Sequence, residues 1–208
     1  MKKSIDLRGL SCPEPVLRTK KLLDDQAIST IEALVDNEVN VQNLTRLARS
    51  QKRALTCNKT EDHFVVIISK ADDSLETAEP AGHNQINAGL ARGGGLVIFI
   101  SKDSFGQGSS DSDHDFSNNL LNVFLQTLEQ AGHKPKAVLM ANAGVKLMDP
   151  QGPHLKVLQA LKEGGSEVLA CGLCLDYYKL KEQVAPEQIT NMFTICEYLI
   201  AADQVISP

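Results

Sequence analysis

The sequence predicts an α/β protein with two domains, over residues 1–70 and 96–208, joined by a linker at residues 71–95. The first seventy residues show strand and helix patterns in the order βαβαββ. From residue 96 onward, continuous apolar runs alternate with helical patterns, which is typical of a parallel sheet covered on both faces. Between these regions the apolar residues follow neither a helical nor a strand period, and the residues are mainly Ala, Asp, Glu, Asn and Gly. We therefore expect two separately packed α/β units.

Each element of the first domain has its own signal. Ile5 and Leu7 fall on one face of an alternating segment, which predicts a strand. Pro13 suits a first helical position, and Asn37 can cap a second helix. The predicted strands are residues 4–8, 31–36, 54–58 and 63–69, the last two forming a hairpin. The helical positions expected to face the core are Val16, Leu23, Ala27, Val41, Leu44 and Ala48.

The second domain alternates strands with helices. Its predicted strands are residues 96–101, 137–141, 167–170 and 204–207. Apolar residues four positions apart indicate a long helix; they are Phe116, Leu120, Phe124 and Leu128. Gly132 is expected to end this helix. Another helix is expected at residues 153–163, stopped by Gly164-Gly165, and a helical turn at residues 176–182. Thr190 is expected to cap a last helix that carries Met192, Ile195 and Leu199.

Composition excludes several classes of protein. Of 208 residues, 42% are hydrophobic and 23% are charged, which indicates neither disorder nor a membrane protein. The net charge of −5 provides no basic face for a nucleic acid. Asp6 precedes any apolar run, so we expect no signal peptide, a cytoplasmic location and reduced cysteines.

Cys12 is the first candidate for chemistry, because it lies between the first strand and the first helix in Cys12-Pro13-Glu14-Pro15. Backbone N–H groups of Glu14 and Val16 at the helix start would favour an anion and lower the pKa of a thiol. The prolines would restrict the loop that presents the sulfur. The alternative is a helix start at which Cys12 only packs.

Residues 6–17, Asp-Leu-Arg-Gly-Leu-Ser-Cys-Pro-Glu-Pro-Val-Leu, resemble the start of the TusA (SirA) family of small sulfur-carrier proteins. The Cys-Pro-x-Pro core, the preceding Leu-Arg-Gly-Leu and the later Val35-Asp36-Asn37 all match that family. The resemblance implies a two-layer βαβαββ sandwich whose motif cysteine, here Cys12, accepts a persulfide and passes it on.

A second candidate is Cys171-Gly172-Leu173-Cys174, directly after a predicted strand, where parallel sheets gather their sites. The spacing fits a redox dithiol, half of a zinc site or two core cysteines. The zinc interpretation lacks two further ligands, because the five histidines are scattered. We expect no metal and no cofactor. The glycine-containing stretch 104–109 lacks the lysine of a phosphate loop, and Cys57 and Cys196 look like core residues.

Residues 96–208 resemble the DsrE family of sulfur-transfer subunits, in which a cysteine after the third strand receives sulfur from a carrier. With its Cys171-Gly172-Leu173-Cys174-Leu175-Asp176 segment, the chain resembles the YedF-type fusions of TusA-like and DsrE-like domains, often described as selenium-metabolism proteins. The resemblance implies that Cys171 is the acceptor, that Cys174 resolves or shields it, and that the DsrE-like domain forms a homo-oligomer.

The resulting hypothesis is a sulfurtransferase-like carrier that relays sulfur or selenium through Cys12 and Cys171 as persulfides. Its partners would be a sulfur donor such as a cysteine desulfurase and a downstream acceptor protein, with neither nucleic acid nor membrane involved. Two alternatives remain: a thiol-disulfide switch built on Cys171 and Cys174, and a regulatory scaffold without cysteine chemistry.

Overall fold

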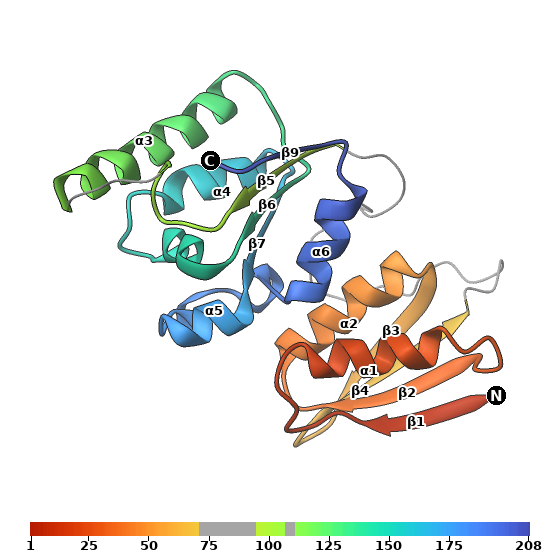
Figure 1. Ribbon diagram of the computed structural model, residues 1–208. Coiled ribbons are helices and arrows are strands. Elements are labelled where there is room, and N and C mark those ends of the chain that lie inside the picture. Colours follow the sequence, from red (N-terminus) through yellow and green to blue (C-terminus); the bar gives the residue numbers. More distant parts are fainter. Residues whose placement is uncertain (71–94, 107–110) are drawn as a thin grey trace. The chain divides into compact units, whose positions relative to one another are not determined.

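The computed structural model describes residues 1–70, 95–106 and 111–208 (Figure 1). The chain divides into two compact units, Met1–Ala91 and Arg92–Pro208. All of the predicted linker except Gly95 lies outside the described residues. None of the described helices combines the length and the apolar character that a bilayer crossing needs.

The first unit is a four-stranded mixed sheet with two helices packed on one face (Figure 1). Its elements are β1 (Lys2–Asp6), α1 (Glu14–Leu23), β2 (Thr30–Val35), α2 (Glu38–Ser50), β3 (Arg53–Lys59) and β4 (Phe64–Lys70). The strand order is β1-β2-β4-β3, with β1 parallel to β2 and the other pairs antiparallel. The predicted βαβαββ order and two-layer α/β class are confirmed.

The core of this unit follows from the alternation along its strands. Ile31, Ala33 and Val35 of β2 are fully or almost fully buried, and Val66 and Ile68 of β4 pack beside them. Period-two spacing places such residues on one face of the sheet, the face that the helices cover. Leu7, Val16, Leu23, Leu44, Leu47 and Ala48 complete the core.

Two boundaries of the first unit differ from the prediction. The first strand starts and ends two residues early, at Lys2–Asp6. Helix α1 ends at Leu23, so the prediction that Ala27 faces the core from a helix was wrong. The carboxylate of Asp25 accepts the N–H of Ala27 at 2.9 Å, a local turn that competes with helical hydrogen bonding. Ile28 is buried in place of Ala27.

The second unit is a five-stranded parallel sheet of order β8-β7-β6-β5-β9. In Figure 1, α3 and α4 lie on one side of these strands and α6 on the other. The strands are β5 (Leu96–Ile100), β6 (Ala137–Met140), β7 (Glu167–Cys171), β8 (Ile189–Thr190) and β9 (Gln204–Ile206). The helices are α3 (Asp111–Gln130), α4 (Leu155–Glu163), α5 (Gly172–Tyr177) and α6 (Met192–Ala201), with 3₁₀ turns η1 (Asn142–Met148), η2 (Lys181–Gln183) and η3 (Pro186–Gln188). All of β6 is buried, as a strand covered on both faces requires.

Three predictions for this unit were wrong in detail. The buried stripe of α3 contains Leu121 and Leu125, whereas Phe116 is 68% exposed. The cap of α6 is Asn191, whose side chain accepts the N–H of Thr194 at 3.0 Å, and Thr190 lies in β8 instead. The helical turn expected at residues 176–182 begins earlier, as α5.

His154 couples the stability of the second unit to pH. It is 2% exposed, and its Nε2 lies 3.1 Å from the backbone oxygen of Asn118. Burial lowers the pKa of His154 below its ordinary 6.5, against the Asn118 contact and the charge of Asp103. The unfolded chain therefore binds a proton that the folded chain resists, and stability is lost as the pH falls through about 6.5.

We expect the free energy of unfolding, measured by urea titration, to fall between about pH 7.5 and about pH 5.5. In His154→Gln this fall should be smaller, whereas His133→Gln, at an exposed position, should keep the parent slope. Equal slopes in the His154→Gln variant and the parent would contradict this role for His154.

Candidate functional site

The loop between β1 and α1, which carries Cys12, begins with a local ion pair. The guanidinium of Arg8 donates from Nε at 3.0 Å and from Nη2 at 2.7 Å to the two carboxylate oxygens of Asp6. The backbone N–H of Arg8 also donates to Asp6, at 3.1 Å. The side-chain hydrogen bond from Arg8, supported by its backbone N–H, lowers the pKa of Asp6 to about 2. Arg8 of the Leu-Arg-Gly-Leu segment therefore fixes the chain where it leaves β1.

Asp36 connects this loop to the start of α2. One of its carboxylate oxygens accepts the N–H of Gly9 at 2.8 Å, and the other accepts the side-chain amides of Asn37 at 2.7 Å and Asn40 at 3.1 Å. Gly9 has φ +70°, a conformation in which glycine is favoured. In the sequence, Asp36 was only part of a motif match; in the structure its carboxylate holds the loop that leads to Cys12, while Asn37 caps α2 as predicted.

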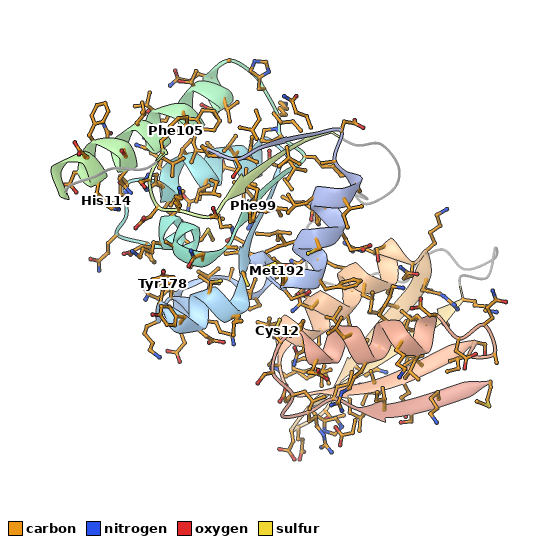
Figure 2. All side chains as sticks on the ribbon, viewed as in Figure 1. Cys12, Phe99, Phe105, His114, Tyr178 and Met192 are labelled. Carbon is orange, nitrogen blue, oxygen red and sulfur yellow. The ribbon has the colours of Figure 1, made fainter. Side chains whose placement is uncertain are left out.

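Cys12 itself lies just before α1, half-buried, and is labelled at that position in Figure 2. The helix begins at Glu14, with Pro13 at the cap position. The next turn is anchored in the interior, because Pro15 and Val16 are buried and the hydroxyl of Thr19 donates to the Pro15 carbonyl at 2.8 Å. The thiol is therefore carried on a segment fixed at both ends.

One part of the predicted cause was wrong. The N–H of Glu14 donates to the Ser11 carbonyl at 2.9 Å, and the N–H of Val16 donates to the Pro13 carbonyl at 3.0 Å. These two amides are engaged by the chain itself and are not free for a sulfur anion. The field of the helix start still favours a thiolate at this position.

The second pair of cysteines lies where β7 meets α5. Cys171 ends the strand and is 2% exposed, whereas Cys174, one turn later, is half-buried. Burial raises the pKa of Cys171, and the Cys174 thiol beside it acts in the same direction, against the backbone N–H groups of Cys174 and Leu173. The Sγ atom of Cys174 accepts the backbone N–H of Asn142 at 3.1 Å. Of the two thiols, Cys174 is the one that a reagent in solution reaches first.

Asn142 is brought to Cys174 by the 3₁₀ turn η1, which follows β6. Gly144 lies so close to the end of β5 that a Cβ at this position would overlap the carbonyl oxygen of Ile100. Asn142 has φ +48°, which is rare for a residue with a side chain. On the other side, a Cβ on Gly172 would lie 3.0 Å from the Ile189 side chain. Two glycines therefore allow η1 and α5 to pack tightly against the sheet edge.

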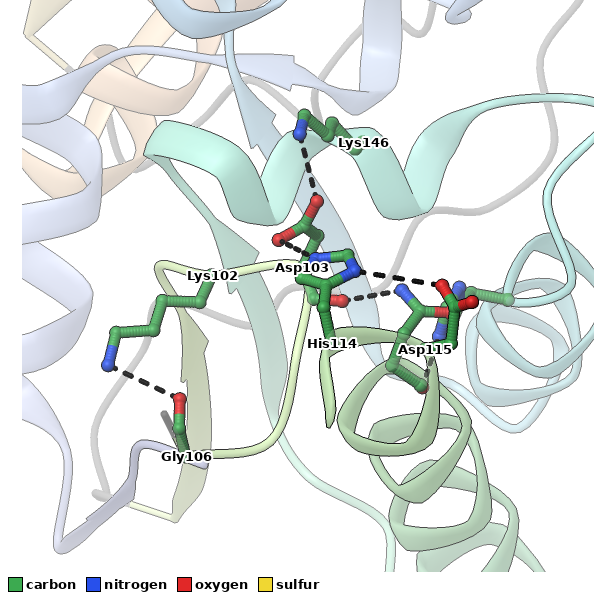
Figure 3. Close-up of polar contacts among 8 residues, drawn as sticks. Lys102, Asp103, Gly106, His114, Asp115 and Lys146 are labelled. Atoms are coloured by element: carbon green, nitrogen blue, oxygen red, sulfur yellow. Dashed lines mark hydrogen bonds and ion pairs between the residues drawn. The ribbon is translucent and has the colours of Figure 1, made fainter. Parts of the chain in front are cut away.

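A polar cluster, Asp103, His114 and Lys146, occupies the same edge of the sheet (Figure 3). Asp103 follows β5 and accepts Lys146 Nζ at 2.9 Å and contacts His114 Nε2 at 3.2 Å. These partners lower the pKa of Asp103 although burial opposes them. Lys146 also lies 5.2 Å from the ring centroid of Tyr178, one turn after Cys174. No sequence pattern predicts this cluster, because its members come from three separate segments.

The two remaining cysteines, Cys57 and Cys196, differ in exposure. Cys196 is exposed on α6, so its assignment to the core was wrong, and Cys57 is half-buried on β3. Within residues 1–70, 95–106 and 111–208, no group of three or more His, Cys, Asp or Glu side chains could hold a metal ion. The glycine-containing stretch 104–109 lies partly outside the described residues.

Comparison with known proteins gives a family for the first unit. Residues 3–70 match the family described as Sulfurtransferase TusA. A SirA-like protein from Desulfitobacterium hafniense is 30% identical over 34% of this chain and 99% of its own, with a TM-score of 0.32. The ychN protein from E. coli is 15% identical over 55% of this chain and 99% of its own, with a TM-score of 0.40. No curated protein matches the chain.

The matched range contains the Asp6–Arg8 pair, Cys12 and Asp36, so it covers the whole loop described above. The match supports a sulfur-carrier role in general. The chain therefore carries a TusA/SirA-like domain over residues 3–70.

Proposed function

We propose that the protein is a persulfide carrier in which Cys12 accepts sulfane sulfur from a donor such as a cysteine desulfurase and passes it to an acceptor thiol. The observation that carries the proposal is the sulfurtransferase match over the loop that presents Cys12. The hydrogen bonds of Asp36 to this loop and the buried Pro15 and Val16 support it, because they hold the thiol-bearing segment in place.

The chemistry needs few groups. A Cys12 thiolate attacks the outer sulfur of the donor's persulfide, a new S–S bond forms on Cys12, and the donor thiolate leaves. Transfer to the acceptor repeats this exchange in the other direction. No general base is required beyond the thiolate itself. The same exchange with selenium would follow this course, and selenium is part of the proposal only as an alternative cargo.

The second unit is proposed to be a DsrE-like domain, which makes the chain a YedF-type fusion with a carrier domain at 1–70, a linker at 71–95 and the DsrE-like domain at 96–208. Support comes from its parallel sheet and from a cysteine pair after its third strand, β7. Its thiols would form a second station for the sulfur. We also propose that this domain forms a homo-oligomer, which sedimentation of the full chain would test.

The carrier proposal is tested by mass spectrometry after incubation with a cysteine desulfurase and cysteine. We expect the chain to gain one sulfur atom on the peptide that contains Cys12. Cys12→Ser should lose that label, and Cys196→Ser, at an exposed cysteine outside the site, should keep it. Equal labelling of Cys12→Ser and the parent would show that the carrier assignment is wrong.

A further inference from the structure

Cys171 and Cys174 differ in the way that a two-step thiol reaction requires. Cys174 is half-buried and its sulfur is held by the N–H of Asn142, whereas Cys171 is 2% exposed and lies at the base of the same turn. Next to Cys174 the surface is open, because Leu173 is 63% and Tyr177 is 77% exposed. A small persulfide therefore meets Cys174 first and does not reach Cys171.

We propose that this pair releases sulfur as hydrosulfide, with Cys174 taking up the sulfane sulfur as a persulfide and Cys171 then displacing it. The inference rests on the proposed function, which supplies the sulfane sulfur. It assigns the second unit a reductive release step, which differs from a simple relay of the persulfide to a further protein.

The atoms and electrons of the two steps balance. In the first, the Cys174 thiolate attacks the outer sulfur of a small persulfide, an S–S bond forms on Cys174, and the donor leaves as a thiolate. In the second, the sulfur of Cys171 attacks the Sγ atom of Cys174 and the bond from that atom to the outer sulfur breaks. The products are a Cys171–Cys174 disulfide and hydrosulfide, which keeps the proton of the Cys171 thiol. A dithiol reductant then restores both thiols.

The burial of Cys171 suits the second step. Because burial raises its pKa, this thiol stays protonated at rest and brings a proton to the leaving sulfur. The step leaves no charge on the buried thiol, because the negative charge of the Cys174 persulfide departs with the hydrosulfide and the disulfide that remains is neutral. Cys171 and Cys174 are three positions apart at the start of a helix, where side chains at this spacing are neighbours. A disulfide needs its two Cβ atoms close together, and this spacing favours it.

A buried hydroxyl lies in register with this thiol. Cys171 pairs with Thr190 of β8 across the parallel ladder, and Thr190 is 0% exposed. Its Oγ1 has no hydrogen-bond partner within the part of the chain that the structure describes. An unsatisfied buried hydroxyl is costly. Thr190 Oγ1 could donate to the Cys171 sulfur only after one of the two side chains rotates during the reaction.

The test uses the full chain with Cys12→Ser, Cys57→Ser and Cys196→Ser, so that the remaining thiols are Cys171 and Cys174 of the second unit. Glutathione persulfide is added in slight excess and removed by rapid desalting, and hydrosulfide, free thiols and peptide masses are followed with time. We expect release of about one hydrosulfide per chain, loss of two thiols, and a Cys171–Cys174 disulfide in the peptide map.

Two further variants separate the roles of the cysteines. In the same background, Cys171→Ser should retain the extra sulfur on Cys174 and release hydrosulfide at least about tenfold more slowly. Cys174→Ser should take up no sulfur at Cys171. The disulfide map of the chain that retains both thiols gives a readout that does not depend on the folding of these variants.

Release from Cys171→Ser at the rate of the parent, uptake at Cys171 in Cys174→Ser, or hydrosulfide release without the disulfide would each overturn the proposal. Because Cys12 is absent and the probe delivers sulfur directly, failure here leaves the labelling of Cys12 by a desulfurase unaffected. Failure of that labelling, in turn, would leave this release reaction intact.

Discussion

Gly144→Ala is expected to destabilise the second unit, and to do so more than Gly172→Ala, the corresponding substitution in α5. The added Cβ would overlap the carbonyl oxygen of Ile100 and lie 2.8 Å from its carbonyl carbon. Both are backbone atoms at the end of a buried strand, so no side chain can rotate away to make room. We expect a loss of about 3 kcal/mol in the free energy of unfolding, the upper end of the range for overpacking. Urea titration of the full chain measures it.

The same substitution should change the chemistry of Cys174. The start of η1 also carries Asn142, whose N–H donates to the Sγ atom of Cys174, so moving η1 away from β5 removes that hydrogen bond. We expect a changed rate of Cys174 alkylation in Gly144→Ala under native conditions. Gly164→Ala is the control for Cys174, because the nearest neighbours of its added Cβ are backbone atoms of Ala160 and Leu161 in α4 and not of η1 or β5. A Gly144→Ala variant within about 0.5 kcal/mol of the parent would contradict the tight packing of η1.

Asp36→Ala has the second largest expected effect, because it releases the loop that leads to Cys12. The substitution removes three hydrogen bonds at once and leaves the side-chain amide of Asn40, which is 6% exposed, without its carboxylate partner. Hydrogen bonds to a charged group contribute about 1.5–3 kcal/mol, and the exposure of Asp36 favours the lower end. We expect a loss of about 2 kcal/mol and faster hydrogen exchange at the N–H of Gly9.

Two variants act as controls for this loop. Asp36→Asn can keep an acceptor on one side only and should lie between Ala and the parent in both measurements. Asp62→Ala removes an exposed carboxylate in the turn between β3 and β4 and should leave Gly9 unchanged. If Gly9 exchanges at the parent rate in Asp36→Ala, the carboxylate does not hold the loop.

The sequence predicted β2 well because one face of this strand is buried, which imposes an alternation of apolar and partly exposed residues. In β2, Ile31, Ala33 and Val35 alternate with partly exposed positions, and a shift of one would expose all three. Helix α3 shows the opposite case. Its Phe116, Leu120 and Phe124 lie next to a parallel stripe containing Leu121 and Leu125, and only the packing of α3 against the rest of the unit decides which stripe is buried.

The candidate sites were predictable as residues but not as contacts. Cys12 was identified from its motif and from its position before a helix, yet the hydrogen bonds made by the amides of Glu14 and Val16 depend on how the chain turns. The turn η1 is too short to show a period, so neither Asn142 nor Gly144 could be linked to Cys174, 32 positions from Asn142. The difference in burial between Cys171 and Cys174 likewise depends on how β8 and α5 cover the end of β7.

The strand order of the first unit places β1 at one edge of its sheet, and this edge is charged. Lys2, Lys3 and Asp6 are exposed along β1, and Lys2 forms a cross-strand ion pair with Glu32 of β2. A second copy that added its own β1 to this edge would bring ammonium groups together and would have to remove them from water, which disfavours pairing of strands between molecules. At high concentration the first unit is thereby protected from growing an intermolecular sheet through β1.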